Sequence, residues 1–582
     1  MFRSKALSSL SVAFIALAQL LHAQQGRGTI LGSVTDPSSA AIAGAKVGIT
    51  NVDTNLTITT QTNGAGFFTT PPVNVGQYRV TVESAGFKRE VRSGIVLEVD
   101  QSAQINVQLQ VGLASESVEV LEEAPLVNAE NPTLGQVIEN DFVKELPLNG
   151  GNALALALLA TDVHSTAGPV QSGFADRGTS LADLSINGGP NSANNLLVDG
   201  IVAQNACYPD LNANLGVDAV QEFKVQSGSM SAEYGFTLGG VVNMATKAGT
   251  NVLHGSASYF FRNDVLDARN AFSPIRAPYR YNQWSAAIGG PVILPKIYNG
   301  KNKTFFFFNY GQYDYITYSD TLTSTPPLAE RTGDFSQLYG STGKLIPIYN
   351  TLTTTVNPNG SGYIRTPFPG NIIPASLLDP VAQAINQFYP APNVTPTGLN
   401  ALTNANNYFS LNRGEQSMVQ YTGRVDEHLS DSDSLFFRLT YYDAYSDGCP
   451  CTWPSHVVNG RFDHFGTRNA VFAETHTFSP RVIDELRVGV ARQDFPFQSA
   501  SYGQDWPWKL GLPSIVPDPV FPTISNGYTS VGNGYVGFRG GQTLDATNTS
   551  TVVLGRHTFK IGVEYRLLLG TNYEPKGALG KL

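Results

Sequence analysis

The chain is poor in charged residues and, beyond its first two dozen residues, lacks long apolar runs. Each shortage excludes a class of protein. Charged residues make up 14% of the 582 positions, against roughly 25% in typical proteins. A disordered chain would have more charge and fewer aromatics than the 10% found here. A helical membrane protein needs apolar runs of about 20 residues, which the rest of the sequence does not contain.

The few cysteines and the negative charge restrict chemistry and partners further. Three cysteines are too few for a disulfide scaffold. Cys449 and Cys451 stand in an expected loop near His456, at a spacing that matches no standard zinc pattern. We expect a local disulfide or two loop thiols there, with Cys207 left over, and we expect no metal and no cofactor. The net charge of -9 argues against nucleic acid as a partner.

The N-terminus has the pattern of a secretory signal peptide, which we expect at residues 1–23. Arg3 and Lys5 precede an apolar run, and Ala23 precedes the expected cleavage point. A short membrane anchor is the alternative, but the run is short for a bilayer. An exported chain without a spanning helix is soluble, attached to a surface, or a β-barrel. The 57 glycines and the many aromatics, 31 Phe and 25 Tyr, favour extended, turn-rich structure.

Residues 26–111 are expected to form a small β-sandwich. Short strands alternate apolar and polar residues, and turn pairs such as Asp36-Pro37 separate them, which is typical of a sandwich. Several segments resemble the carboxypeptidase regulatory-like domain, namely 32–36, 44–47, 62–68, 78–80 and 85–87. The resemblance implies an accessory module with a carbohydrate-binding-like fold. No zinc ligands or general base are evident in it, so we expect no peptidase; sugar binding and a structural spacer stay open.

Residues 112–125 are expected to be a linker that contains a short acidic, β-branched strand. The strand consists of Glu116, Ser117, Val118, Glu119 and Val120. An exposed strand of this kind can pair through its main chain with the edge of a partner's sheet. The residues alone leave two other interpretations open, the last strand of the sandwich and a plain linker.

The composition changes again in residues 126–250, for which we expect a mixed α/β domain. An apolar residue at every fourth position predicts a helix over 138–146 that ends at Pro147, and a second helix is predicted over 153–160. Asp199-Gly200 stands between apolar runs and predicts a tight hairpin turn. The glycine pair at 188–189 lacks the Lys-Ser or Lys-Thr of a phosphate-binding loop.

An ordered series of motifs resembles TonB-dependent outer-membrane receptors of the Oar-like kind, which also carry the N-terminal sandwich. The motifs are 220–225, 231–235, 239–243, 246–251 and 254–255. The resemblance implies that 126–250 is a plug domain and that Glu116 to Val120 lies where the TonB box is found. It also implies the outer membrane of a Gram-negative bacterium, TonB as a periplasmic partner, and uptake of an unidentified extracellular ligand. Covalent chemistry is not implied.

Residues 251–582 are expected to form the N-terminal part of an outer-membrane β-barrel. The clearest strand has two different faces. The apolar face consists of Phe559, Ile561, Val563, Tyr565 and Leu567, and the opposite, mostly polar face consists of Thr558, Lys560, Gly562, Glu564 and Arg566. Such a strand fits lipid outside and a wet lumen inside. Residues 305–308 and Tyr310 suggest an aromatic girdle, 319–414 a long outer loop, and 430–433 a short periplasmic turn rather than a calcium loop.

The number of strands suggests an incomplete barrel. We count about nine or ten strands after residue 250, against 22 in the large plugged barrels of outer-membrane transporters. The chain is therefore expected to be a C-terminally truncated fragment. The predicted fold is mainly β: a sandwich, a mixed α/β plug and an incomplete transmembrane antiparallel barrel.

The predicted function is TonB-dependent transport of a ligand across the outer membrane, with membrane lipid around the barrel. The alternative is a surface adhesion or carbohydrate-binding protein without transport. We predict no enzyme, because neither a metalloprotease HExxH pattern nor a GxSxG nucleophile elbow is present.

Overall fold

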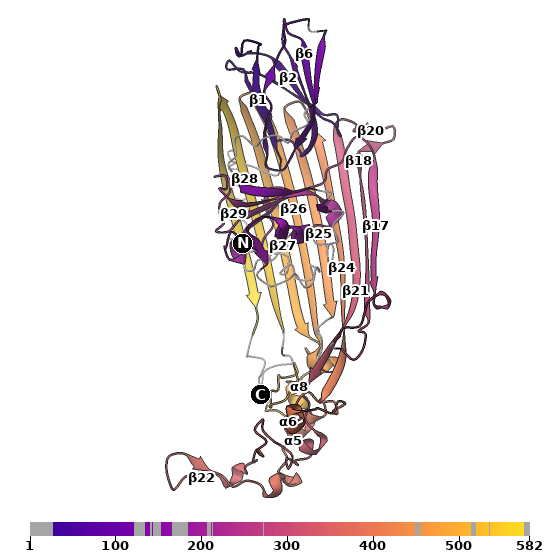
Figure 1. The fold of residues 1–582 in the computed structure, drawn as a ribbon, viewed down its shortest axis with the longest axis vertical. Helices are drawn as coiled ribbons and strands as arrows, with labels where there is room; N and C mark the ends of the chain where they lie inside the picture. The colour runs from indigo at the N-terminus through magenta and orange to yellow at the C-terminus, as the bar shows by residue number, and fades with distance from the viewer. Residues whose placement is uncertain are drawn as a thin grey trace, which may run out of the picture.

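The computed structural model describes residues 27–575, except 114, 122–133, 140–141, 144–152, 166–183, 206–210, 212, 272, 448–452, 454, 514–519, 533 and 535. The expected signal peptide, all three cysteines and Pro147 lie outside these residues. Strands dominate the described part, so the mainly β prediction is confirmed. A small sandwich lies at one end of a tall strand wall, and long loops lie at the far end (Figure 1). The domain predicted as a plug, called the plug below, lies against the middle of the wall.

The sandwich consists of two sheets that share one core. The larger has the order β3 (Thr57–Gln61), β2 (Lys46–Asn51), β5 (Gly76–Glu83), β6 (Arg89–Leu97) and β9 (Ser117–Leu121). The smaller joins β4 (Phe67–Thr69), β1 (Thr29–Thr35), β7 (Ser102–Gln104) and β8 (Val107–Gln108). Ile30 and Val34 of β1 pack in one buried cluster with Val47 and Val80 of the larger sheet. The alternating pattern therefore buries one face of each sheet, as predicted.

The plug is built on a five-stranded sheet. Its order is β10 (Leu134–Ile138), β15 (Val220–Gly228), β16 (Val241–Thr246), β13 (Asn195–Val198) and β14 (Ile201–Val202). A small hairpin, β11 (Val163–Ser165) and β12 (Leu184–Ile186), and three 3₁₀ helices, η3 (Ala153–Leu159), η4 (Asn191–Ala193) and η5 (Val217–Ala219), complete its described part.

The two predicted plug helices differ in outcome. The one over 138–146 was wrong at its start, because Ile138 ends strand β10 and pairs with Phe223 of β15. Pairing with a neighbouring strand outweighs a local four-residue period here. The predicted helix over 153–160 is present, as the 3₁₀ helix η3.

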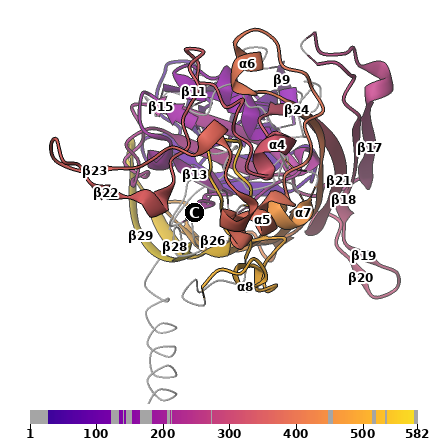
Figure 2. The same ribbon diagram turned by 90° about the horizontal axis from the view of Figure 1, so that it is seen from below.

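Nine antiparallel strands form the wall, paired in chain order. They are β17 (His254–Asn263), β18 (Tyr279–Pro291), β21 (Thr304–Thr323), β24 (Tyr408–His428), β25 (Asp433–Asp447), β26 (Arg461–Ser479), β27 (Val482–Ser499), β28 (Val536–Leu554) and β29 (His557–Tyr573). The predicted strand count is confirmed for the described residues. The wall curves round the plug (Figure 2) without pairing β17 to β29, so this barrel is open.

The two faces of the wall differ as predicted. On β25, Phe437 and Leu439 point outward and are about half exposed, whereas Arg438 and Thr440 point inward and are buried. The aromatic run on β21 divides in the same way. Phe305 and Phe307 are buried, at 2% and 3% exposure, while Phe308 is 42% exposed. Only alternate members of this run can therefore face lipid, which corrects the expectation of an aromatic girdle over the whole run.

Long loops and short turns occupy opposite ends of the wall (Figure 1). The far end holds α4 (Leu328–Arg331), η7 (Thr351–Thr353), β22 (Thr355–Val356), β23 (Tyr363–Ile364), η8 (Pro369–Asn371), η9 (Ala375–Leu377), α5 (Pro380–Asn386), α6 (Leu399–Thr403), α7 (His456–Asn459), α8 (Trp506–Lys509) and η6 (Asp264–Leu266). The sandwich end has the short turns and the β19 (Ile293–Leu294) and β20 (Tyr298–Asn299) hairpin. The turn at 430–433 is among the short ones, as predicted. No helix of the described residues is both long and apolar enough to cross a bilayer.

Candidate functional site

A hairpin turn of the plug reaches the wall. Asp199 and Gly200 connect β13 to β14, whose register pairs Val198 with Ile201. Both turn residues have positive φ, 51° and 79°, as a two-residue hairpin of this type requires. The predicted turn is therefore confirmed. The wall residues that contact this turn belong to three strands far away in the sequence, and no local sequence pattern predicts them.

The Asp199 carboxylate is buried among arginines of the wall. Its Oδ2 accepts a hydrogen bond from Nε of Arg438 at 2.6 Å, and Nη1 of Arg424 lies 3.6 Å from its Oδ1. The main-chain N–H and the hydroxyl of Thr246 on β16 also donate to it. Nη1 of Arg487 donates to the Asp199 carbonyl at 2.6 Å. Burial alone raises the pKa of Asp199, but the arginines and Thr246 outweigh it and hold the pKa below its usual value.

The salt bridges of this ion cluster are balanced in charge. Arg424 pairs with Asp426 at 2.7 Å and Arg487 with Glu485 at 2.5 Å, so three carboxylates face three guanidinium groups. Burying charges is costly unless each one is paired. The cluster therefore holds the plug in one position by polar contacts, beside a small apolar cluster in which Ile201 of the plug packs with Phe436, Val471 and Ala473 of the wall.

Further contacts tie the plug to the last strands of the wall. The Val202 N–H donates to Asp545 of β28 at 3.0 Å, and Nζ of Lys560 on β29 lies 2.8 Å from Oε1 of Glu233 in the plug. Arg566 lies over the Phe236 ring of the plug, 5.0 Å from its centre. The sequence therefore identified Lys560 and Arg566 correctly as residues of the inner face.

The sandwich contacts the plug through the turn at 98–101, which follows β6. The Asp100 carboxylate accepts hydrogen bonds from Tyr234 at 2.7 Å and from Asn243 at 3.0 Å. Lys224 of β15 donates to the Asp100 carbonyl at 3.1 Å. Glu222, also on β15, accepts from the Val99 N–H, and burial raises its pKa to about 8. Sequence reasoning assigned no role to these residues, because their partners lie more than a hundred positions away.

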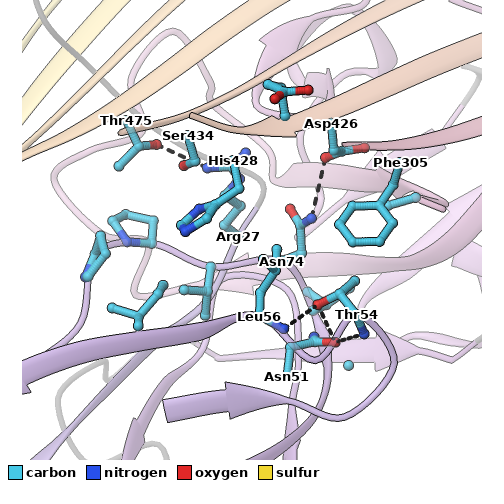
Figure 3. Close-up of a pocket in the computed structure, with 18 of the residues that line it drawn as sticks. Arg27, Asn51, Thr54, Leu56, Asn74, Phe305, Asp426, His428, Ser434 and Thr475 are labelled. Carbon is cyan, nitrogen blue, oxygen red and sulfur yellow. Dashed lines mark hydrogen bonds between the residues drawn. The ribbon is translucent and has the colours of Figure 1, made fainter. Parts of the chain in front are cut away.

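The sandwich also rests on the end of the wall. Nδ2 of Asn63 donates to the Gly555 carbonyl in the β28–β29 turn at 2.7 Å, and Arg27 donates to Thr475 of β26 at 3.0 Å. A cavity of about 180 Å³ lies between the sandwich, the end of the plug sheet and the wall. Figure 3 shows Arg27, Asn74 and Asp426 among its lining residues. The sandwich is thus in contact with both the plug and the wall.

The five predicted interaction residues, Glu116 to Val120, lie at the edge of the sandwich. Ser117–Leu121 is strand β9, which runs parallel to β6 with Val118 opposite Glu90. Nζ of Lys88 lies 2.7 Å from a carboxylate oxygen of Glu116, and the Arg89 N–H donates to the Glu116 carbonyl. Main-chain groups alternate in direction along a strand, so those of Ser117 and Glu119 point away from β6. No strand of the described residues pairs with that outer edge.

One group of side chains in the described residues has the composition of a metal site. The ligand atoms of Asp433, Glu474 and His476 all lie within 4.8 Å of one another. Nδ1 of His476 and Oδ1 of Asp433 are hydrogen bonded at 2.5 Å, which already satisfies these two atoms. Sequence reasoning considered only Asp433, since the other two residues belong to the neighbouring strand.

Comparisons with known proteins agree with this architecture. A family described as "Outer membrane beta barrel domain" matches residues 245–582, and one described as "Carboxypeptidase regulatory-like domain" matches residues 29–110. The TonB-dependent transporter Oar of Myxococcus xanthus is 25% identical over 282 residues, which cover 46% of this chain and 26% of that protein. The chain thus spans about a quarter of that relative's length.

Two solved structures illustrate the structural similarity. The outer membrane transporter YddB from Escherichia coli has 12% identity and a TM-score of 0.43, over 74% of this chain and 48% of that one. The siderophore receptor PirA from Acinetobacter baumannii has 12% identity and a TM-score of 0.33, over 76% and 58%. The relative Oar is named as a transporter and not as an enzyme, in agreement with the prediction. Because the barrel family covers more than half of the chain, the protein belongs to the outer membrane β-barrel domain family of Gram-negative bacteria.

Proposed function

We propose that the protein is a TonB-dependent transporter that takes up an extracellular ligand through the outer membrane. The observation that supports this most is the Asp199 ion cluster, which holds a folded domain inside the wall by polar contacts. A plug that must move needs a joint of this kind, because ion pairs can exchange partners without exposing a large apolar surface. The name of the relative Oar supports the same function.

In the proposed cycle, a ligand binds the long loops and the nearest part of the plug. Glu116 to Val120 then serve as the TonB box, to which the periplasmic domain of TonB adds a strand. Energy from the inner membrane pulls on that strand and rearranges the plug. Lipid surrounds the outer face of the wall, where residues such as Phe437 are exposed.

We propose for the chain the same five parts that the sequence predicts. The parts are a signal peptide at 1–23, the sandwich at 26–111, a linker with the TonB box at 112–125, the plug at 126–250 and the barrel segment at 251–582.

The free edge of β9 gives a sharp test. In Glu119→Pro the N–H that points away from β6 is lost, so we expect binding of the purified TonB periplasmic domain to fall at least tenfold, about 1.4 kcal/mol. The matched control is Thr59→Pro on β3, the opposite edge of the same sheet. Titration calorimetry with the detergent-solubilised protein measures both. Equal binding by the wild type and Glu119→Pro would contradict the assignment, and a pure adhesin would bind TonB in neither form.

A further inference from the structure

The sandwich makes contacts that a passive spacer does not need. It rests on the wall through Asn63 and Arg27, and its 98–101 turn enters the plug. Asp100 is 6% exposed, and its carboxylate accepts hydrogen bonds from three plug side chains, Gln226, Tyr234 and Asn243. A buried carboxylate with several donors fixes one geometry, because each donor loses its partner if the turn withdraws.

The same plug strand is held from both sides. On β16, Asn243 donates to Asp100 of the sandwich, whereas Thr246 donates to Asp199 within the ion cluster. Thr246 also accepts a hydrogen bond from Arg424 of the wall. The sandwich contact and the wall contact are therefore three residues apart on one strand, so that release of either one loosens the position of the other.

The strand proposed to bind TonB is adjacent to this contact. Strand β9 pairs with β6 along its whole length, and β6 ends at Leu97, immediately before the 98–101 turn. A pull on β9 therefore reaches the turn through β6, in addition to the direct covalent route along the chain to the plug.

We infer that the sandwich is a periplasmic latch: its 98–101 turn locks the plug, and a pull on β9 withdraws this turn before the plug moves. The inference rests on the proposed function for the origin of the force, but the latch itself depends only on the sandwich, plug and wall contacts. In this arrangement TonB adds a sixth strand to the sandwich sheet. The sandwich leaves the wall together with β9, and the plug loses Asp100 as the acceptor for Asn243.

Single-molecule pulling on the whole protein in a supported bilayer tests the latch. The probe is the TonB periplasmic domain on the cantilever tip. We expect two events, an early rupture as the sandwich detaches and a later extension of the plug. Asp100→Ala should shift the early rupture to lower force. The matched control, Asp36→Ala, removes a partly exposed carboxylate that accepts hydrogen bonds from Ser38 and Ala40 of its own turn, and should leave that force unchanged.

A cross-link gives the second arm of the experiment. Asn63→Cys with Gly555→Cys, in a background with the three native cysteines changed to Ser, ties the sandwich to the wall through a short bismaleimide. Plug extension should then be lost, whereas each single cysteine variant treated with the same reagent should keep it. Normal plug extension in the cross-linked protein, or an early rupture insensitive to Asp100→Ala, would overturn the latch.

The latch can be tested even if TonB does not bind. Attachment of the tip through a DNA tether to a cysteine placed by Glu119→Cys applies the same pull without TonB. Absence of adhesion by the TonB domain alone would contradict the proposed box. Plug extension through the tether without an early rupture would contradict the latch.

Discussion

Substitution of Arg438 by Met should loosen the plug selectively. Arg438 is fully buried and makes the shortest contact with the Asp199 carboxylate, 2.6 Å. Removing one partner of a buried ion pair typically costs about 3–5 kcal/mol. Asp199 keeps Thr246 and the more distant Arg424, so the lower end applies, about 3 kcal/mol. At 1.4 kcal/mol for each factor of ten, the open form of the hairpin should become about 100-fold more populated.

Hydrogen exchange at the Val202 amide measures this opening directly. That N–H donates to Asp545 of the wall and can exchange only when the β13–β14 hairpin leaves it. The control is Arg492→Met, which breaks a surface pair with Asp494 in which the arginine side chain is 58% exposed. Such pairs contribute about 1 kcal/mol or less.

A double variant separates the ion pair from a general loss of packing. Asp199→Asn together with Arg438→Met removes both charges, and we expect it to cost less than the sum of the two single changes. Val202 protection in Arg438→Met within threefold of the wild type, or additive effects in the double variant, would refute the ion cluster as the joint between plug and wall.

Three further predictions concern the other contacts. Below the ordinary Glu222 pKa of 4.5 the docked and undocked states both hold the proton, whereas between 4.5 and about 8 only the docked state does. Sandwich–plug docking should therefore weaken as pH rises and level off above about 8. Glu222→Gln should flatten the pH profile of the protection factor at the Val99 amide, which is the exchange rate corrected for the intrinsic pH dependence of exchange. Gly489→Ala places a Cβ 2.2 Å from Cγ2 of Ile201 and should displace the hairpin, whereas Gly423→Ala, which meets only Phe308 at 4.0 Å, should not; intrinsic fluorescence after limited proteolysis of the plug compares them. Phe437→Arg on the outer face should cost about 2–4 kcal/mol in folding into lipid vesicles, measured by urea titration.

Much of the wall could be predicted from the sequence, because a strand between lipid and water has a period of two. The alternation from Phe559 to Leu567 shows which side chains point toward lipid and which point toward the lumen. It also shows that the main chain of this strand must be hydrogen bonded to neighbouring strands. The hairpin at Asp199 was equally predictable, since its two residues tolerate positive φ. Ile138 was predicted in a helix because its four-residue spacing is a local property, whereas its strand partner, Phe223, is far away in the sequence.

The ion cluster was beyond such reasoning for a related reason. In the sequence, three arginines are charged residues on the inner faces of strands like many others: Arg424, Arg438 and Arg487. Asp199 is recognisable only as a turn residue. Their function arises from the register that places three wall strands around one plug hairpin. The Asp100 contact could not be predicted for the same reason, because nothing in the sequence of the polar turn after β6 indicates which plug residues bind it.

The acidic strand shows how two interpretations of one segment can hold together. From the residues alone, Glu116 to Val120 were the last strand of the sandwich, a plain linker or a strand for a partner, and the first and the last of these are compatible. Because a strand presents alternate main-chain groups on its two edges, pairing with β6 occupies only those of Glu116, Val118 and Val120. No strand among the described residues pairs with those of Ser117 and Glu119. A partner strand can therefore add without displacing β9, and in the proposed cycle its pull reaches the sandwich before it reaches the plug.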